Sequence, residues 1–383
     1  MPIEELTRNA VDVLPAGGLE AKLKLGRPLR VKFGIDVTSP DIHVGRGIPL
    51  QRMRAFQDEG HMGVLIVGDY TTRIGDPSGR STERPIPSGE EIDANAQLYL
   101  DQAKVILRDD PELLEVRYNG EWLSTLSYAD VVRLGRIVTL ARMLERDDFD
   151  KRYRAGEPIS ISELLYPLMQ AYDSVAVDAD VELGGTDQLY NLLAGREVME
   201  AYGLEPQVVV TTPLLLSWDG EKMSSSVGNN IPLTAPPEEM FGRTMRIPDS
   251  QLEEWWTLVA ERPLPQGDPL EAKLELARFI VARSHGEEAA RQAEEHFTRV
   301  VRRGEAPEEV SERVLPADDP VHLPALLADA FGLSTSEARR LIAQGGVKVD
   351  GESVNEIDVP RTRLEGTVLQ AGKRRFVRLN GAA

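Results

Sequence analysis

A histidine, a glycine and an arginine stand together in the stretch DIHVGRGIP, residues 41–49. The stretch follows RVKFGID, a short apolar run with the rhythm of a strand, and leads into residues with helical spacing. His43 and Gly45 would then stand at a helix N-terminus, where unpaired backbone N–H groups and the helix dipole favour a phosphate. Gly45 would admit the phosphate close to the backbone, and His43 and Arg46 would add side-chain donors. A histidine packed in the core is the alternative for this motif taken alone.

The stretch EKMSSSVGNN, residues 221–230, carries a second cation. Lys222 is followed by Met223, three serines and a Gly-Asn-Asn run, just after the turn WDG. A lysine on a flexible Ser/Gly loop is a mobile cation with donors beside it, and it can follow phosphate as charge shifts in a transition state. A surface turn without function would have the same composition.

Polar side chains also mark one predicted helix and two predicted loops. In LLYPLMQAYDS, Tyr166, Gln170 and Asp173 fall at i, i+4 and i+7, so one helix face shows a phenol, an amide and a carboxylate. A polar stripe in an apolar helix costs free energy unless it meets a partner, which can be a polar ligand or other core groups. The loops ELGGTDQ and IGDPSGRSTER add glycines, acceptors and cations, namely Gly185, Asp187, Gln188, Asp76, Arg80 and Arg84. A structural turn is the alternative for the first of these loops.

Strand and helix patterns place these residues along one edge of a sheet. The run RVKFGID, the helical segment GIPLQRMRAFQDEGH and the run GVLIVGD form a strand, helix, strand unit of the kind that builds a parallel sheet. Ligands gather at the carboxyl ends of such strands. A second set of apolar runs, SVAVDADVELGG and QVVVTTPLLLS, follows a helix-rich segment at about 86–162, which we expect to interrupt the sheet as an insertion. The predicted fold class is α/β, with a Rossmann-like, doubly wound parallel sheet.

The remaining chain divides into a helical part and a basic part. Residues 236–313 show charged helical patterns, and a Pro/Asp-rich hinge, LPADDPVHLP, leads to a predicted helix, glycine turn and short strands. From Ser336 onward there are nine Lys/Arg and six Asp/Glu, whereas the whole chain has a net charge of -19. The basic residues could form one phosphate-binding face, or only a solvated helix face beside a charged edge strand. They are Arg339, Arg340, Lys348, Lys373, Arg374, Arg375 and Arg378.

Length and composition exclude several classes of protein. A chain of 383 residues is expected to form two or three domains. The absence of cysteine excludes disulfides, thiolate metal sites and a cysteine nucleophile. No run approaches the ~18 apolar residues that span a bilayer, and MPIEELTRNA is not expected to act as a signal peptide. We therefore expect a cytoplasmic protein without a membrane partner, and we find no cluster that resembles a dedicated metal site.

The order of the motifs is more specific than any single one. GIDVTSPDIHVGR, GDPSGRSTER, YPLMQAYDS, LGGTDQ and KMSSS occur in the order found in class I aminoacyl-tRNA synthetases, and the chain resembles the bacterial tyrosyl-tRNA synthetases over essentially its whole length. Residues 43–46 are similar to the family's His-Ile-Gly-His signature, and residues 222–226 to its Lys-Met-Ser-Lys-Ser loop. The Tyr-x-x-x-Gln-x-x-Asp helix and the Gly-Gly-Thr-Asp-Gln run look like the tyrosine and ATP sites of this family.

The resemblance implies a tyrosine–tRNA ligase reaction in two steps. Tyrosine would attack the α-phosphate of ATP, which is expected to carry Mg²⁺, and the tyrosyl group of the resulting adenylate would pass to the 3′ end of tRNA(Tyr). The implied tyrosine-binding residues are Asp76, Tyr166, Gln170, Asp173 and Gln188. The implied ATP-binding residues are Asp36, Thr38, His43, Gly45, Gly185, Asp187, Lys222, Met223 and Ser224. The implied catalytic groups around the phosphates are His43, Arg46, Lys222, Arg80 and Arg84.

The resemblance also implies three domains and a homodimer. A catalytic domain would occupy residues 1–232 and carry the dimer interface in its helical insertion at about 86–162. An α-helical tRNA-binding domain would follow at 233–318, and a small α+β, S4-like RNA-binding domain at 319–383. This favours the RNA-binding interpretation of Arg339, Arg340, Lys348, Lys373, Arg374 and Arg375.

Two positions depart from the family pattern. Arg46 replaces the second histidine of the signature, and Ser225 replaces the second lysine of the loop. We hypothesise that a positive charge has moved from the loop to the helix start, where Arg46 stands in for the missing cation. Arg46 pointing to solvent, or weak adenylate formation in a specialised paralogue, are the alternatives. Lys32 stands where some members carry a tyrosine at the substrate hydroxyl, so a modified tyrosine also stays open as substrate.

Other functions stay open beside the ligase. An enzyme of the same fold could activate tyrosine or an analogue for an acceptor other than tRNA, or the chain could bind RNA through a catalytically weak synthetase body. A plain dinucleotide-binding enzyme is disfavoured, because the first strand is not followed by a G-x-G-x-x-G turn.

Overall fold

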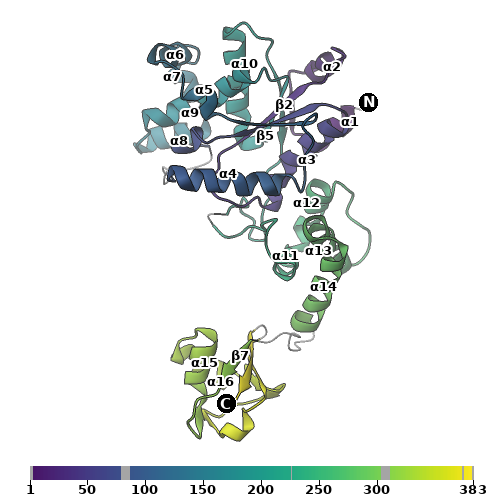
Figure 1. The fold of residues 1–383 in the computed structure, drawn as a ribbon, viewed down its shortest axis with the longest axis vertical. Coiled ribbons are helices and arrows are strands. Elements are labelled where there is room, and N and C mark those ends of the chain that lie inside the picture. The colour runs from purple at the N-terminus through teal and green to yellow at the C-terminus, as the bar shows by residue number, and fades with distance from the viewer. Residues whose placement is uncertain (1–2, 79–86, 226, 303–310, 373–374, 382–383) are drawn as a thin grey trace. The chain divides into compact units, whose positions relative to one another are not determined.

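The computed structural model describes residues 3–78, 87–225, 227–302, 311–372 and 375–381 (Figure 1). The chain divides into two compact units, Met1–Pro236 with Arg243–Leu276, and Pro237–Gly242 with Ala277–Ala383. Four predicted site residues lie outside the described residues, namely Arg80, Arg84, Lys373 and Arg374. Among the described residues, no helix has the length and apolar character needed to cross a membrane.

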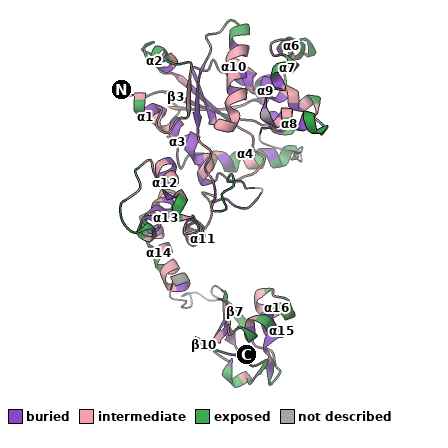
Figure 2. Ribbon diagram, turned by 180° about the vertical axis from the view of Figure 1, so that it is seen from behind, coloured by how far each residue is buried: buried purple, intermediate pink, exposed green. Residues whose placement is uncertain are grey.

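A six-stranded sheet with the order β1-β6-β5-β2-β3-β4 forms the centre of the first unit. The strands from β6 to β4 are parallel, and β1 pairs antiparallel with β6 at the edge. Figure 2 shows the inner strands buried, which explains why their sequences are mostly apolar. The strands are β1 (Asp12–Leu14), β2 (Arg30–Ile35), β3 (Met62–Val67), β4 (Leu114–Tyr118), β5 (Val181–Gly185) and β6 (Val208–Thr212).

Helices cover both faces of this sheet. A Cβ atom on Gly63 of β3 would lie 3.0 Å from the Met53 side chain, so α3 packs on that face. Ile66 points to the opposite face, where it shares a core cluster with Trp122 of α5. The predicted α/β, doubly wound parallel fold is therefore confirmed.

The helices of the first unit vary widely in length. They are α1 (Ile3–Leu6), α2 (Gly18–Leu23), α3 (Val44–Asp58), α4 (Gly89–Ala103), α5 (Gly120–Leu123), α6 (Tyr128–Leu134), α7 (Leu140–Met143), α8 (Asp147–Ala155), α9 (Ile161–Ala176), α10 (Leu189–Ala201) and α12 (Leu252–Trp255). Short 3₁₀ and π turns complete them at η1 (Thr71–Arg73), η2 (Thr186–Gln188), η3 (Asp249–Gln251) and η4 (Trp256–Ala260). Two helices, α11 (Pro237–Thr244) and α13 (Pro269–His285), contain the points of division between the units.

Two elements of the first unit differ from the sequence prediction. The segment at 86–162 is not purely helical, because β4 extends the sheet beside β3. The sequence LEVRY is short, half-buried and charged, so its strand pattern is weak beside the long helical patterns around it. The predicted run SVAVDADVELGG is a strand only from Val181, because α9 continues to Ala176.

The C-terminal residues 311–381 form a small body with its own apolar core. Its elements are β7 (Glu312–Val314), β8 (Val321–His322), α15 (Leu323–Phe331), α16 (Thr335–Ala343), β9 (Val347–Val349), β10 (Glu352–Ser353), β11 (Asp358–Val359), η6 (Arg361–Arg363), β12 (Val368–Ala371) and β13 (Arg375–Asn380). α14 (Glu287–Phe297) and η5 (Thr298–Arg302) precede it. The predicted helix, glycine turn and short strands are confirmed in α16, β9 and β10. β7 pairs with β13 although it lies before the predicted boundary at residue 319.

Candidate active site

A cavity of about 820 Å³ opens at the carboxyl ends of β2 and β5. The chain passes from β2 through β3 to β4 in one direction and from β5 to β6 in the other, so these two strands flank the switch point of the sheet. Ligands of doubly wound sheets bind at such points. The predicted residues that line the cavity are Asp36, Thr38, His43, Gly45, Arg46, Asp76, Tyr166, Gln170, Asp173, Gly185, Asp187, Gln188, Lys222, Met223 and Ser224. Ser225 lines it as well.

His43 is the N-cap residue of α3. Its Nδ1 accepts the backbone N–H of Arg46 at 3.3 Å, so the neutral ring carries its proton on Nε2. Burial first, and then the charges of Arg46 and Lys222, lower the pKa of His43 to about 3. The imidazole is therefore a neutral hydrogen-bond donor at physiological pH, beside the first turn of the helix.

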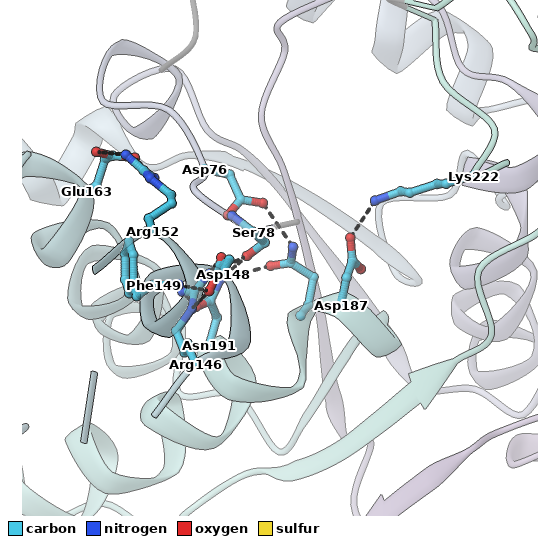
Figure 3. Close-up of polar contacts among 11 residues, drawn as sticks. Asp76, Ser78, Arg146, Asp148, Phe149, Arg152, Glu163, Asp187, Asn191 and Lys222 are labelled. Atoms are coloured by element: carbon cyan, nitrogen blue, oxygen red, sulfur yellow. Dashed lines mark hydrogen bonds and ion pairs between the residues drawn. The ribbon is translucent and has the colours of Figure 1, made fainter. Parts of the chain in front are cut away.

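Two cations from distant parts of the chain line the same cavity as His43. Arg46 Nη1 lies 3.4 Å from Ser39 Oγ and 3.5 Å from the Asp41 carbonyl oxygen. Lys222 Nζ donates to Asp187 Oδ2 at 2.6 Å, which joins the serine loop to the end of β5 (Figure 3). Arg46 thus lines the cavity, which does not match the alternative in which it only points to solvent.

The end of β5 requires a glycine next to this carboxylate. A Cβ atom on Gly185 would lie 2.7 Å from Asp187 Oδ1 and 2.9 Å from Leu214, distances that real Cβ atoms do not show. Across the cavity, Asp36 accepts hydrogen bonds from Thr71 Oγ1 at 2.7 Å and from the Tyr166 hydroxyl at 3.0 Å. Each of the two strands at the switch point is therefore followed by a carboxylate that lines the cavity, Asp36 after β2 and Asp187 after β5.

Asp173 is buried at the inner end of the cavity. Its Oδ1 accepts Trp122 Nε1–H at 2.8 Å, and its Oδ2 accepts Asn119 Nδ2–H at 3.3 Å. Burial raises the pKa of Asp173 to about 7, and the charge of Lys32 and the two hydrogen bonds act against this shift. A carboxylate with one fixed donor on each oxygen keeps acceptor capacity for a further donor from the cavity.

A buried ion pair supports the helix that carries Asp173. Lys32 Nζ lies 2.8 Å from Glu182 Oε1, and it donates to Ser174 Oγ at 2.7 Å and to the Gln170 carbonyl oxygen at 2.9 Å. Lys32 does not line the cavity. The amide oxygen of Gln170 is buried and has no hydrogen-bond partner among the described residues.

Sequence reasoning missed the partners of Asp173. Asn119 and Trp122 follow β4 directly, at the same carboxyl edge as the other site residues. Their signal was the Asn-Gly turn after LEVRY, which only a prediction of β4 would have made visible. Asn191 of α10 and Arg146 at the start of α8 were missed too, and both lie behind the cavity wall.

Three predicted RNA-binding residues are exposed on the C-terminal body, and two of them, Arg340 and Arg375, lie near the same carboxylate. Arg339 and Arg340 are exposed on α16, and Arg375 is exposed at the start of β13. The pKa of Glu337 is lowered first by hydrogen bonds from Ser334 and then by the charges of Arg340 and Arg375. The helix and the strand therefore bring these two arginines to the same carboxylate.

Two other basic residues lie on the opposite face of the sheet. Lys348 alternates along β9 with Val347, which belongs to the core, and Arg378 alternates along β13 with the core residue Val377. The single basic face considered from the sequence is thus divided between two sides of the sheet, because strand neighbours point to alternate faces.

The affinity for a phenolic ligand is expected to increase as the pH rises through about 7. The ordinary pKa of an aspartate is 3.8, and burial raises that of Asp173 to about 7, so the group is largely protonated at pH 6 and ionised at pH 8. Only the ionised form offers a charge-assisted bond to a phenol. We expect KM for such a substrate to fall by about tenfold from pH 6 to pH 8. His43 stays neutral throughout this range.

The raised pKa of Asp173 also makes the stability of the folded protein depend on pH. In the ligand-free protein the contribution of Asp173 is complete below about pH 3.8, and it is lost as the pH rises to about 7, because the unfolded chain ionises first. Asp173→Asn should show neither dependence when KM and unfolding are measured across this range. A wild-type KM that does not change between pH 6 and pH 8 would contradict the prediction that ionised Asp173 accepts the phenol of the ligand.

Comparisons with known proteins agree with this geometry. Residues 24–302 match the family described as tRNA synthetases class I (W and Y), and residues 323–358 match the S4 domain. The chain is 46% identical to the tyrosine–tRNA ligase of Thermotoga maritima, over 99% of this chain and 97% of that protein. It is 49% identical to the tyrosine–tRNA ligase of Symbiobacterium thermophilum, over 98% of this chain and 96% of that protein.

A solved structure is similar in fold. The tyrosyl-tRNA synthetase from Archaeoglobus fulgidus, complexed with L-tyrosine, superposes with a TM-score of 0.60 at 23% identity, over 76% of this chain and 98% of that chain. Since the motifs occur in the family's order and the relatives match along their whole length, the chain belongs to the class I tyrosyl-tRNA synthetases that carry an S4 domain.

Proposed function

We propose that this chain is a tyrosine–tRNA ligase, which activates tyrosine with ATP and transfers it to tRNA(Tyr). One observation carries the proposal: the cavity has a buried acceptor, Asp173, at its inner end, and it is lined elsewhere by His43 and Lys222, which lie far apart in the sequence. The inner end suits a phenol, and the two donors suit a triphosphate. The full-length similarity to tyrosine–tRNA ligases supports the same substrates.

Tyrosine would enter with its hydroxyl group towards Asp173. The phenol would donate to the carboxylate that Trp122 and Asn119 hold in place. At the other end of the amino acid, the carboxylate of Asp76 would accept from the ammonium group, and the side chain of Gln170, which also lines the cavity, would lie beside it. Tyr166 and Gln188 complete this end of the proposed pocket.

ATP would occupy the rest of the cavity with its phosphates at the start of α3. Asp187 would accept from the ribose hydroxyls after Lys222 leaves it for the phosphates, while Asp36, Thr38, Gly45, Gly185, Met223 and Ser224 would surround the nucleotide. The Lys222–Asp187 ion pair is half-exposed, and such pairs contribute only ~0–1 kcal/mol, so a triphosphate can displace it. His43 and Arg46 would donate to the phosphates from the helix start. Mg²⁺ would enter as part of the nucleotide substrate.

The reaction needs no covalent enzyme intermediate. The carboxylate of tyrosine attacks the α-phosphorus, pyrophosphate leaves, and the developing negative charge meets fixed donors and cations. Positioning and charge stabilisation of this kind account for large rate enhancements. The 3′ hydroxyl of tRNA would then attack the carbonyl of the adenylate.

The other parts of the chain would serve tRNA binding and assembly. We propose that residues 1–232 form the catalytic domain, that 233–318 and the S4-like part at 319–383 bind tRNA, and that Arg339, Arg340 and Arg375 contribute phosphate contacts. A homodimer through the insertion is supported by its exposed apolar side chains, among them Tyr128 at 85% and Ile161 at 76% exposure. We place the protein in the cytoplasm.

Amino-acid-dependent exchange of pyrophosphate into ATP tests the proposed activity. Exchange with tyrosine alone among the twenty amino acids, followed by transfer to tRNA(Tyr) and not to small-molecule acceptors, is the expected result. Absence of tyrosine-dependent exchange would contradict it, and transfer to another acceptor would favour the paralogue. Sedimentation of the wild type against Tyr128→Lys tests the dimer.

The charge hypothesis for Arg46 and Ser225 makes a separate prediction. Arg46→His should slow adenylate formation by about 10²-fold, since one preorganised donor at the phosphates is weakened. Adding Ser225→Lys should recover most of that loss, because the total positive charge is restored. Single-turnover adenylate formation measures both, with Ser225→Lys alone as the control. Equal losses in the single and the double variant would reject the compensation.

A further inference from the structure

A closed ring of hydrogen bonds joins three residues that line the cavity, Asp76, Ser78 and Gln188, to Arg146 and Asn191, which do not line it. Arg146 Nη1 donates to Asn191 Oδ1 at 2.9 Å, and Asn191 Nδ2 donates to Gln188 Oε1 at 3.0 Å. Gln188 Nε2 donates to Asp76 Oδ2 at 2.9 Å. The backbone N–H of Ser78 donates to Asp76 Oδ1 at 2.9 Å, and the Ser78 hydroxyl accepts from Arg146 Nη2 at 3.1 Å, which closes the ring (Figure 3).

The guanidinium group of Arg146 is held from every side. Its Nε and Nη2 donate to Asp148 at 3.1 and 2.7 Å, and the rings of Phe149 and Tyr190 lie 4.7 and 5.3 Å from its central carbon. Arg146 is 7% exposed and Asn191 is fully buried. A planar group with this many fixed partners cannot turn without losing several of them.

The ring has a direction that Arg146 imposes. A guanidinium only donates and a carboxylate only accepts, so the two amides between Arg146 and Asp76 can satisfy both ends in only one orientation. Asn191 must turn its oxygen to Arg146, and its nitrogen then faces the oxygen of Gln188. Gln188 must therefore present its nitrogen to Asp76. With donors fixed on both of its oxygens, the Asp76 carboxylate keeps its remaining lone pairs for a cation.

We propose that Arg146 and Asn191 are positioning residues that aim the Asp76 carboxylate at the α-ammonium group of the amino-acid substrate. Arg146 and Asn191 do not line the cavity themselves. They act through Gln188 and Ser78, which do. The proposal rests on the proposed function and deepens it. It connects the segment between β4 and α9, which contains Arg146, to recognition of the amino group.

Ligands that differ in the ammonium group test this role. Binding of tyrosine, tyramine and 3-(4-hydroxyphenyl)propionate to the full-length protein is measured by calorimetry, with wild type and Arg146→Met. Tyrosine and tyramine carry the ammonium group and should bind about 10- to 100-fold more weakly to the variant, the range for a lost hydrogen bond to a charged group. The propionate lacks the ammonium group, and its affinity should change by less than about twofold.

A second variant tests the direction of the ring without removing Arg146. Asn191→Asp keeps an acceptor for Arg146 but sets a carboxylate oxygen against Gln188 Oε1, so the Gln188 amide is expected to turn its oxygen towards Asp76. Asn191→Asp should therefore lose more tyrosine affinity than Asn191→Ala. The reverse order would overturn the polarity argument, and it can be measured even if Arg146→Met does not fold.

Arg142→Met is the matched control. Arg142 lies in the same segment and also pairs with α10, through Glu197 at 2.9 Å, but it is exposed. It should bind all three ligands as the wild type does. An equal loss for all three ligands in Arg146→Met, or no loss for any, would overturn the proposal. A wild type that binds tyrosine without tyrosine-dependent exchange would contradict the proposed function and leave the ring testable by binding.

Discussion

Asp173→Ala is expected to remove most of the preference for tyrosine over phenylalanine. A site that hydrogen-bonds a substrate hydroxyl rejects the analogue without it by about 10⁴–10⁵-fold, since the buried polar groups are otherwise left unpaired. In the variant, Trp122 and Asn119 lose their acceptor. Residue 173 then no longer distinguishes the hydroxyl group of tyrosine from the hydrogen atom that phenylalanine carries in its place. We expect the ratio of kcat/KM for the two amino acids to fall to about tenfold or less, measured by pyrophosphate exchange.

The control for this experiment is Asp178→Asn. Asp178 is an exposed acid just after the same helix, and its positive φ of 48° is tolerated by asparagine. It should keep the wild-type ratio. If Asp173→Ala still prefers tyrosine by more than about 10³-fold, the phenol is recognised elsewhere, and the proposed orientation of tyrosine in the cavity is wrong.

Lys222→Met is expected to slow adenylate formation by about 10²–10³-fold. Removing one preorganised donor at a developing negative charge costs about this much in rate. Lys222 and Asp173 lie at different parts of the cavity, so the Kd for tyrosine should not change. Rapid-quench measurement of a single turnover separates the chemical step from binding.

Lys24→Met serves as the matched control, because Lys24 is an exposed lysine at the end of α2 in the same unit. It should react at the wild-type rate. A weaker tyrosine affinity in Lys222→Met, with an unchanged rate, would show that the lysine acts on the amino acid and not on the phosphates.

Sequence reasoning found the residues that stand at the ends of strongly patterned elements. β2, β3, β5 and β6 are largely buried and their sequences are mostly apolar, so His43 and Asp187 could be placed just beyond strand ends. β4 lies at the edge, and its sequence LEVRY alternates charged and apolar residues over only five positions. Because that strand was missed, Asn119 and Trp122 were missed with it.

Contacts between distant segments could not be read from local patterns. Arg146 looks like one more charged residue in a charged helical segment, and nothing in its neighbourhood indicates that it is buried against Asn191 and Ser78. The division of the basic residues around β9 and β13 depends on strand pairing in the same way. Each of these facts is a matter of which side chains meet across elements.

The sequence by itself determined the fold class, the order of the motifs and the types of group that meet a substrate, because periodicity and turn chemistry are local properties of the chain. Only the tertiary structure decided that His43 is a neutral donor, that Asp173 is clamped by two donors, and that Arg146 orients a ring of amides. Burial and hydrogen-bond direction set these properties, and both arise from neighbours that are distant in sequence.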